Sequence, residues 1–485
     1  LISAPDSVYA FQVASDPATP ISKRVIDQTA SYTTVDDTTI EWVGKPGLVT
    51  DTFESYFWAP MPEHVWGKYS ADELLEAEEV NRNPLGWGAY AVEEWQPGAY
   101  IRLRKNPFYF RTDEGLPVFD HLTFKITNPN GDTNISNLKF DRSPFEYFNL
   151  DIGEFNQEIE ENGCDLISST ANMRDQLSIL NILTNYYQDP SVVIHKLQTG
   201  DQDVLFFNLR ESYDSFEPGL DKKANPLSSK DVRKAIGFCL DHERVNSSVY
   251  YGQPDPPRIW VEASADKIDQ TASTFNSETG IELLEESGWM DHDEDKNTGR
   301  ISSSVENIPN GTSLTFSYLT VDTLNNRSAA YIYKESLAEC GIDIIIKSVP
   351  PEIFWDPSTE MSIFKGKFNL AQVEWTTPIN NPCPLVISTN IPGESNGFAG
   401  INFSAYTSSL IDKECATFSE TTLKEEKEQT LENILRIISE EVPFLPLNTH
   451  PKFIVSRNDL CEINDKINSA FSAIEGFVFE TPCSN

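Results

Sequence analysis

Two adjacent stretches decide the fold of this chain, NPLGWGAYAVEEWQPG at residues 83–98 and IRLRKNPFYF at residues 101–110. Residues 89–95 and 100–104 alternate apolar and polar side chains, which is the spacing of half-buried strands. Pro97 and Gly98 between these runs are typical of a tight turn, and Gly86 and Gly88 suit a turn before the first run. The pattern therefore predicts a glycine-rich turn that leads into a β-hairpin.

Length and composition predict a soluble globular protein. The chain has 485 residues, enough for two or three domains with a large buried core. Apolar residues make up 39% and charged residues 23%, which is typical of folded domains. There is no run of eighteen or more apolar residues, so we expect no membrane-spanning segment. Residues 1–6 resemble neither a signal peptide nor a native translation start.

The formal net charge of −38 comes from 75 acidic and 37 basic side chains. This balance argues against a nucleic-acid partner, because binding to phosphates requires clustered lysine and arginine. It also argues against docking on anionic lipid head groups. A highly soluble, self-repelling surface is the simplest interpretation, and adaptation to high salt is the alternative.

Seven cysteines are present, and none has the spacing of a zinc site. Cys239 and Cys340 each lie in an amphipathic helical pattern and are expected to be buried apolar residues. Four others lie among loops and helix ends of the last third and could form one or two disulfides in an oxidising compartment. These four are Cys383, Cys415, Cys461 and Cys483. The pairing stays open.

Helical and strand periodicities place further elements along the chain. Strands are expected at residues 36–43, 119–126, 204–209, 314–319, 342–349 and 442–447. Helices are expected at residues 71–79, 228–241, 280–288, 327–339 and 425–440, and a proline-rich turn at 58–66. Ser228 and Asp231 have the spacing of a capping box, and Gly341 is a ready C-cap. Residues 314–349 thus form a predicted βαβ unit with parallel strands.

The opening stretches resemble the segment N-P-x-G-x-G-x-Y-x-V-x-x-W-x-P-G…L-x-x-N-P-x-Y of the family 5 extracellular solute-binding proteins. These are the oligopeptide-, dipeptide- and nickel-type receptors that feed ABC importers. Residues 231–244, followed by Gly252 and Pro254, resemble a second family segment, and the resemblance runs colinearly along essentially the whole chain. It implies an α/β fold of the two-domain periplasmic-binding-protein type II kind, with hinged lobes, mixed sheets and the remnant of a third small lobe.

The same resemblance implies a division of the chain. Residues 1–84 would be the remnant of the small inserted lobe, 85–207 the first ligand-binding lobe, 208–444 the second, and 445–485 the return to the first. The chain would cross between the lobes at about residues 206–210 and 443–448, and two crossings make a hinge. Residues 1–11 resemble a segment that lies well inside a full-length receptor, which implies that a substantial N-terminal portion is missing.

The resemblance also names candidate ligand residues. Glu374 and Trp375 close a segment at 368–375 whose tryptophan, in the family, lies near the cleft between the lobes. Asn396, Asn402 and Tyr406 match a second family segment, and an aromatic face with amides suits peptide backbones or sugars. The alternative is that the tryptophan belongs to the core and the others order a loop. Residues 376–383 lack the acidic residue that often holds a peptide's amino group in this family, which gives weight to oligosaccharides.

A possible cation loop follows the helix predicted at 280–288. Asp291, Asp293 and Asp295 alternate as oxygen ligands do in calcium loops. However, Lys296 and Ser302 occupy the positions where an EF-type loop has glycine and glutamate. The alternative is a solvated acidic turn. Calcium is the one cofactor for which the sequence gives a reason.

Motifs of catalysis are not found in the sequence, which lacks G-x-S-x-G, H-E-x-x-H and a P-loop. We therefore expect a binding protein and not an enzyme. The resemblance implies an extracellular substrate-binding protein of an ABC importer, which binds an oligopeptide in a cleft between two lobes and docks on a permease. It would be lipid-anchored or secreted at the cell surface, or periplasmic. An oligosaccharide receptor of the same fold and a cell-surface hydrolase with an unrecognised carboxylate site are the alternatives.

Overall fold

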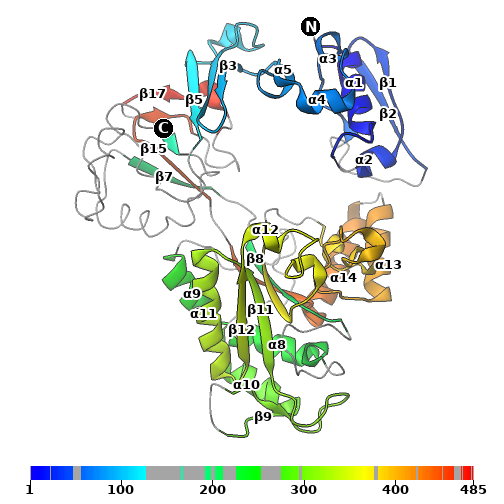
Figure 1. Cartoon of the computed structure of the whole chain (residues 1–485), viewed down its shortest axis with the longest axis vertical. Helices are drawn as coiled ribbons and strands as arrows, with labels where there is room; N and C mark the ends of the chain where they lie inside the picture. Colours follow the sequence, from blue (N-terminus) through cyan, green and yellow to red (C-terminus); the bar gives the residue numbers. More distant parts are fainter. Residues whose placement is uncertain are drawn as a thin grey trace.

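The computed structural model describes residues 2–21, 23–46, 56–126, 165–167, 192–197, 202–210, 225–252, 275–293, 298–375, 381–421, 424–449, 452–463, 471, 473–481 and 483. Figure 1 shows these residues in three groups: an N-terminal unit, a group around β3 and β5, and a larger lobe around β8, β11 and β12. Within these ranges, no helix is both long and apolar enough to cross a membrane.

The N-terminal unit packs helix α1 (Ala4–Ser15) on the hairpin of β1 (Thr29–Asp36) and β2 (Thr39–Gly44). The single strand predicted at 36–43 is therefore wrong. A turn interrupts it, because the Asp36 carboxylate accepts a hydrogen bond from the backbone N–H of Thr38 at 2.8 Å. Short helices complete the unit: α2 (Arg24–Asp27), α3 (Glu63–Trp66), α4 (Ala71–Glu76) and α5 (Glu78–Asn81).

The hairpin predicted from the opening stretches is confirmed. Strands β3 (Tyr90–Gln96) and β4 (Tyr100–Lys105) pair antiparallel, and β5 (His121–Lys125) continues the sheet. Gly98 in the turn has φ +76°, a conformation that favours glycine. The buried Asn106 fixes the preceding glycine-rich segment, since its Nδ2 donates to the carbonyl of Gly88 at 2.8 Å.

The C-terminal residues return to this sheet. Glu475 accepts hydrogen bonds from Arg111 at 3.0 Å and from the Tyr109 hydroxyl at 3.3 Å. The rings of Phe119 and Phe479 lie 5.1 Å apart. Residues far apart in the sequence thus build one group of elements, shown at the upper left of Figure 1.

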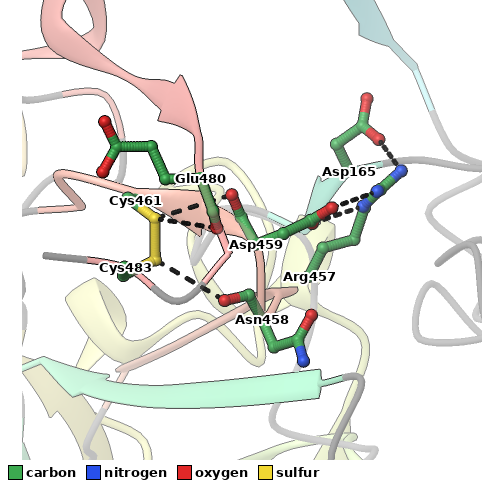
Figure 2. A network of polar contacts seen from close by, with 7 residues as sticks. All are labelled: Asp165, Arg457, Asn458, Asp459, Cys461, Glu480 and Cys483. Carbon is green, nitrogen blue, oxygen red and sulfur yellow. Dashed lines mark hydrogen bonds and ion pairs between the residues drawn. A yellow bond between two sulfur atoms is a disulfide. The ribbon is translucent and has the colours of Figure 1, made fainter.

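A second small sheet has the order β6-β15-β7, with β6 (Leu166–Ile167), β15 (Lys452–Arg457) and β7 (Val192–Leu197). Figure 2 shows the charged network at its end. Arg457 donates to Asp459 at 2.8 Å through Nε and pairs with Asp165 at 3.2 Å. The hydrogen bonds from Arg457 lower the pKa of Asp459. The adjacent ribbon of β16 (Leu460–Cys461) and β17 (Val478–Phe479) is closed by the Cys461–Cys483 disulfide.

The larger lobe is built on a five-stranded sheet of order β12-β11-β13-β8-β14. Its strands are β8 (Gln202–Phe207), β11 (Thr315–Val321), β12 (Asp343–Val349), β13 (Leu370–Trp375) and β14 (Phe444–Thr449). One face packs on apolar residues of α8 (Lys230–Cys239), α9 (His242–Val249) and α11 (Leu324–Glu339). The other packs on α13 (Ser409–Glu420) and α14 (Lys424–Glu441). The result is a three-layer α/β/α lobe (Figure 1).

The smaller elements of this lobe lie at its borders. They are α10 (Ser277–Glu286), α12 (Pro351–Phe354) and a ribbon of β9 (Trp289–Met290) with β10 (Ile301–Ser302). The helix predicted at 280–288 thus begins three residues earlier.

The predicted βαβ unit is confirmed, because β11 and β12 are parallel neighbours joined by α11. Gly341 ends the connection with φ +73°. The predicted capping box of Ser228 and Asp231 is wrong. The helix begins one residue later with Ser229 as N-cap, because residues Pro226–Ser228 form a separate 3-10 turn capped by Asn225.

Two strands near the predicted crossings belong to the sheet of the larger lobe. Both β8 and β14 are strands of the larger lobe's sheet, so this lobe includes residues 202–207 and 445–449. The chain therefore enters the lobe before Gln202 and leaves it after Thr449. The boundary placed between residues 207 and 208 falls after a complete strand, and that placed at 445 falls inside one.

Cys239 and Cys340 form a disulfide across 101 residues, which corrects their expected role as free buried side chains. They lie at the ends of α8 and α11, and both are fully buried. Cys383–Cys415 and Cys461–Cys483 are also disulfides, so the last-third cysteines pair as two bridges. Sequence periodicity shows that a helix is amphipathic but not which other helix end it meets.

Arg233 of α8 connects the helix layer to the start of β14. Its guanidinium is 3% exposed and donates to the carbonyls of Leu227 at 2.6 Å and Val442 at 2.9 Å. It also bonds the carbonyls of Ser228 and Glu441. Burial lowers the pKa of Arg233 to about 10, so the side chain remains charged at neutral pH.

Candidate functional site

Strand directions define one edge of the five-stranded sheet as the candidate site. Only β8 runs antiparallel to its neighbours, so its first residue lies beside the carboxyl ends of the other strands. Gln202 pairs with Trp375 on one side and with Thr449 on the other. Gln202 and Thr449 are also the residues next to which the chain enters and leaves the larger lobe. In open α/β sheets, ligands bind outside the carboxyl ends of the strands.

Glu374 and Trp375, two of the predicted ligand residues, lie at this edge at the end of β13, and both are half-buried. Because side chains alternate along a strand, they point to opposite faces of the sheet. Trp375 packs beside the cluster under α13 and α14. Its indole Nε1 is buried and has no hydrogen-bond acceptor within the described part of the chain. Glu374 lies directly opposite Asp203 of β8.

A buried polar layer supports the edge from below. Gln372 donates from Nε2 to the Asp203 carboxylate at 2.9 Å, and its Oε1 accepts from the Tyr318 hydroxyl at 3.1 Å and the Thr320 hydroxyl at 3.2 Å. Tyr250 adds a hydroxyl 3.4 Å from Asp203. Two hydroxyl donors on Oε1 fix the amide so that its N–H groups face the carboxylate. All five side chains are at most 1% exposed.

Burial raises the pKa of Tyr318 well above its ordinary value, so its hydroxyl stays protonated and available as a donor. Through Gln372, the hydrogen bonds of this layer join β13 to β8 and to β11. We infer that the layer holds β8 and β13 in register beneath Glu374 and Trp375. Sequence reasoning did not find these residues. The available signal was a polar residue inside an otherwise apolar strand, as with Asp203 and Gln372.

A second series of buried hydrogen bonds links α9 to strand β14. Asn448 donates to the Tyr333 hydroxyl at 2.9 Å, and this hydroxyl lies 3.3 Å from Nδ1 of His242. Since Tyr333 accepts from Asn448, its own proton is free to go to Nδ1, which leaves the His242 proton on Nε2. Complete burial lowers the pKa of His242 to about 4, so the ring is neutral at neutral pH.

Asn402 and Tyr406 lie elsewhere and serve a loop. Asn402 is fully buried, and its Nδ2 donates to the carbonyls of Ile387 at 3.0 Å and Tyr406 at 2.9 Å. Its Oδ1 accepts from the Tyr406 backbone N–H at 3.2 Å. Asn396 likewise accepts from Gly393 and donates to a loop carbonyl. The amide groups proposed for ligands are thus engaged with the backbone.

The sheet also separates these residues from Trp375. Ser404, beside Asn402, accepts from Leu209 and donates to Pro443, which places this loop at the opposite edge of the sheet. A six-residue strand such as β8 spans about 17 Å. The structure therefore brings Glu374 and Trp375 together at one edge, and Asn402 and Tyr406 near the other. Residues 376–380 lie outside the described residues.

The predicted calcium loop is described only in part. The ligand atoms of Asp291, His292 and Asp293 lie within 4.8 Å of one another, and all three residues are exposed. Thr298 donates to Asp293 at 2.8 Å. Asp295 lies outside the described residues. The calcium site remains a prediction.

A comparison of the chain with protein families shows the family to which it belongs. The model described as bacterial extracellular solute-binding proteins, family 5 Middle, matches residues 2–140 and 163–397. The chain belongs to this family. The resemblance in the opening stretches is thereby confirmed, and family 5 is a family of solute-binding proteins and not of enzymes.

Individual relatives are distant. The oligopeptide-binding protein AppA of Bacillus subtilis is 21% identical over 397 residues, which cover 80% of this chain and 60% of AppA. The chain thus spans less than two thirds of that relative. The structure of AppA with a nonapeptide superposes with a TM-score of 0.64 at 18% identity, covering 99% of this chain and 84% of AppA.

A second solved structure is the oligopeptide-binding protein of Thermotoga maritima, with a TM-score of 0.69 at 16% identity. The superposition covers 95% of this chain and 78% of the Thermotoga maritima protein. Both superpositions support the predicted fold class, the type II periplasmic-binding-protein fold with mixed α/β lobes.

Proposed function

We propose that this protein is the substrate-binding component of an ABC importer and that it takes an oligopeptide between its two lobes. The observation that carries the proposal is the row of Gln202, Trp375 and Thr449, where the carboxyl edge of the sheet coincides with both chain crossings. Family membership supports it, and so does the AppA structure, which holds a nonapeptide.

The site would act by closure of the lobes. A ligand shifts a hinged protein to its closed state by its differential affinity for that state. Trp375 offers an aromatic edge and a buried indole N–H that has no acceptor among the described residues, and these suit an apolar side chain and a peptide carbonyl. Glu374 carries its carboxylate at the same row of residues. The layer of Asp203 and Gln372 below keeps both in place.

The remaining parts of the proposal concern the cellular setting. The protein acts outside the cytoplasmic membrane, at the cell surface or in the periplasm, and its closed form docks on a permease. It binds its ligand without converting it. The family to which the chain belongs supports each of these points.

A thermal-shift screen tests the proposal, because a ligand that binds only the folded state raises the melting temperature. The probes are mixed peptides of two to nine residues and, separately, β-linked oligosaccharides. We expect peptides to raise the melting temperature in proportion to the logarithm of their concentration. A response to oligosaccharides alone would favour the alternative receptor.

A matched pair of variants ties the response to the edge. Trp375→Ala is expected to weaken the peptide response, whereas Trp87→Ala is expected to leave it unchanged. Trp87 is 45% exposed and lies in the segment before β3, outside the larger lobe. A peptide response that survives Trp375→Ala at full strength would contradict the placement of the site.

A further inference from the structure

The structure contains a pocket, away from the interlobe edge, at the junction between the N-terminal unit and the sheet of β3. Its volume is about 590 Å³. One wall comes from residues around α5 and the other from β3. The lining residues are Tyr69, Glu78, Glu79, Arg82, Asn83, Val92, Glu93, Glu94 and Trp95. In Figure 1, α5 and β3 lie well apart from the sheet of β8 and β11.

An irregular strand explains how four consecutive residues reach this pocket. In a regular strand only alternate side chains face one side. Strand β3, however, shifts register against β4 between Val92 and Glu94. Such a bulge re-aims neighbouring side chains, and bulges are common beside functional sites. As a result, residues 92–95 all line the same cavity.

The charge of the pocket decides whether a cation or a neutral ligand suits it better. Its four carboxylates would favour a cation if they were free. Three of them are already paired: Glu79 with Lys68 at 2.8 Å, Glu93 with Arg102 at 3.1 Å, and Glu78 with Arg82 at 3.7 Å. Among the lining residues only Arg82 is positive. Lys68 and Arg102, which lie outside the lining, offset two more of the four negative charges, so the pocket and its ion-pair partners together carry a net charge of −1. A remaining charge of −1 gives only a weak preference to a cation.

The same pairs fix the orientation of many hydrogen-bonding groups. Tyr69 donates to Glu79 at 2.6 Å, and the hydrogen bond from Lys68 lowers the pKa of Glu79, which keeps this carboxylate ionised as an acceptor. Glu94 accepts from Gln96 at 2.9 Å. The pocket thus combines oriented acceptors, the donors of Arg82 and Asn83, and the half-buried indole of Trp95.

We propose that this junction pocket binds a neutral saccharide. Hydroxyl groups can both donate to the fixed carboxylates and accept from Arg82 and Asn83, while the ring packs on the indole of Trp95. A volume of about 590 Å³ lies within the range of small-molecule sites. Because both walls would contact the sugar, its binding would also hold the N-terminal unit against the β3 sheet.

The test is a titration of the full chain with maltotriose, cellotriose and mannotriose, followed by calorimetry. We expect at least one to bind, and we expect Trp95→Ala and Glu79→Gln each to raise its dissociation constant about tenfold. Glu79 is solvent-exposed, so its replacement by the isosteric amide tests binding without disturbing the fold. Spermidine, a cation without hydroxyl groups, is expected to show no binding that Trp95→Ala or Glu79→Gln weakens.

Each of the following results would overturn the proposal: no binding of any of the sugars, sugar binding that is unaffected by both variants, or binding of spermidine in place of sugars. A sugar response lost in Trp375→Ala but kept in Trp95→Ala would place the sugar at the interlobe edge and also contradict it. The peptide response of the Trp95→Ala protein is expected to match the unmodified chain. This comparison separates failure of the junction pocket from failure of the peptide site.

Discussion

Removing the Cys239–Cys340 disulfide is expected to destabilise the larger lobe more than removing Cys383–Cys415. The first pair spans 101 residues and the second 32. In the chain-entropy relation, closing loops of these lengths is worth about 4.7 and about 3.7 kcal/mol at 25 °C. Replacing each pair by alanine therefore changes the free energy of unfolding by amounts that differ by about 1 kcal/mol.

The two pairs are matched controls for each other. All four sulfurs are buried, with exposures of at most 6%, so the cavities left by alanine are similar. Urea unfolding of the two double variants, followed by circular dichroism, gives the two free energies. An equal loss, or a larger loss for Cys383→Ala with Cys415→Ala, would refute the reasoning from loop length.

Gly280 offers an independent check of the first disulfide. A Cβ atom at this position would lie 2.3 Å from the Sγ of Cys239 and 3.2 Å from the carbonyl oxygen of Ala235. Gly280→Ala should therefore cost about 1–3 kcal/mol in the oxidised protein and clearly less in the Cys239→Ala, Cys340→Ala background. Equal costs in both backgrounds would show that the disulfide does not contact α10 as described.

Three further predictions concern the larger lobe. The pKa of His242 is about 4 in the folded protein and 6.5 in the unfolded chain, so below pH 6.5 only the unfolded state gains the proton. The free energy of unfolding should therefore fall by about 3 kcal/mol between pH 6.5 and pH 4. Urea unfolding of His242→Gln should lack this pH dependence. Arg233→Met leaves buried carbonyls without a donor and should cost about 3–5 kcal/mol in the same assay, whereas an unchanged midpoint would contradict its linking role. If the loop of Asp291 and Asp293 binds calcium, the metal should raise the melting temperature and Asp293→Asn should reduce the rise; no shift at millimolar calcium would refute the site.

Local patterns in the sequence predicted the elements that depend on neighbouring residues. The alternation at residues 89–104 with Pro97 and Gly98 gave the hairpin, and the periods at 314–349 gave the βαβ unit. The misplaced helix start at Ser228 and the missed turn at Asp37 are of a different kind. Each depended on a competing local hydrogen bond, accepted from a backbone N–H by the side chain of Asn225 or Asp36 respectively, whose strength the pattern does not reveal.

The site could be predicted only in part, because its geometry comes from strand order. Trp375 and Glu374 are adjacent in sequence, so they remain together at the sheet edge. Asn402 follows by fewer than thirty residues, yet its loop packs on Leu209 at the far edge. The antiparallel insertion of β8 sets this separation, and it brings Asp203 directly opposite Glu374. The spacing of residues along the sequence does not predict that strand order.

Hydrogen exchange with and without a saturating peptide, chosen from the thermal-shift screen, tests the central claim most directly. If the peptide lies at the carboxyl edge, backbone amides at residues 202–203, 374–375 and 448–449 should exchange more slowly in its presence. The amides of residues 402–406 should be unchanged. Protection confined to that loop, or to residues 69–95 of the junction pocket, would contradict a peptide site between the lobes.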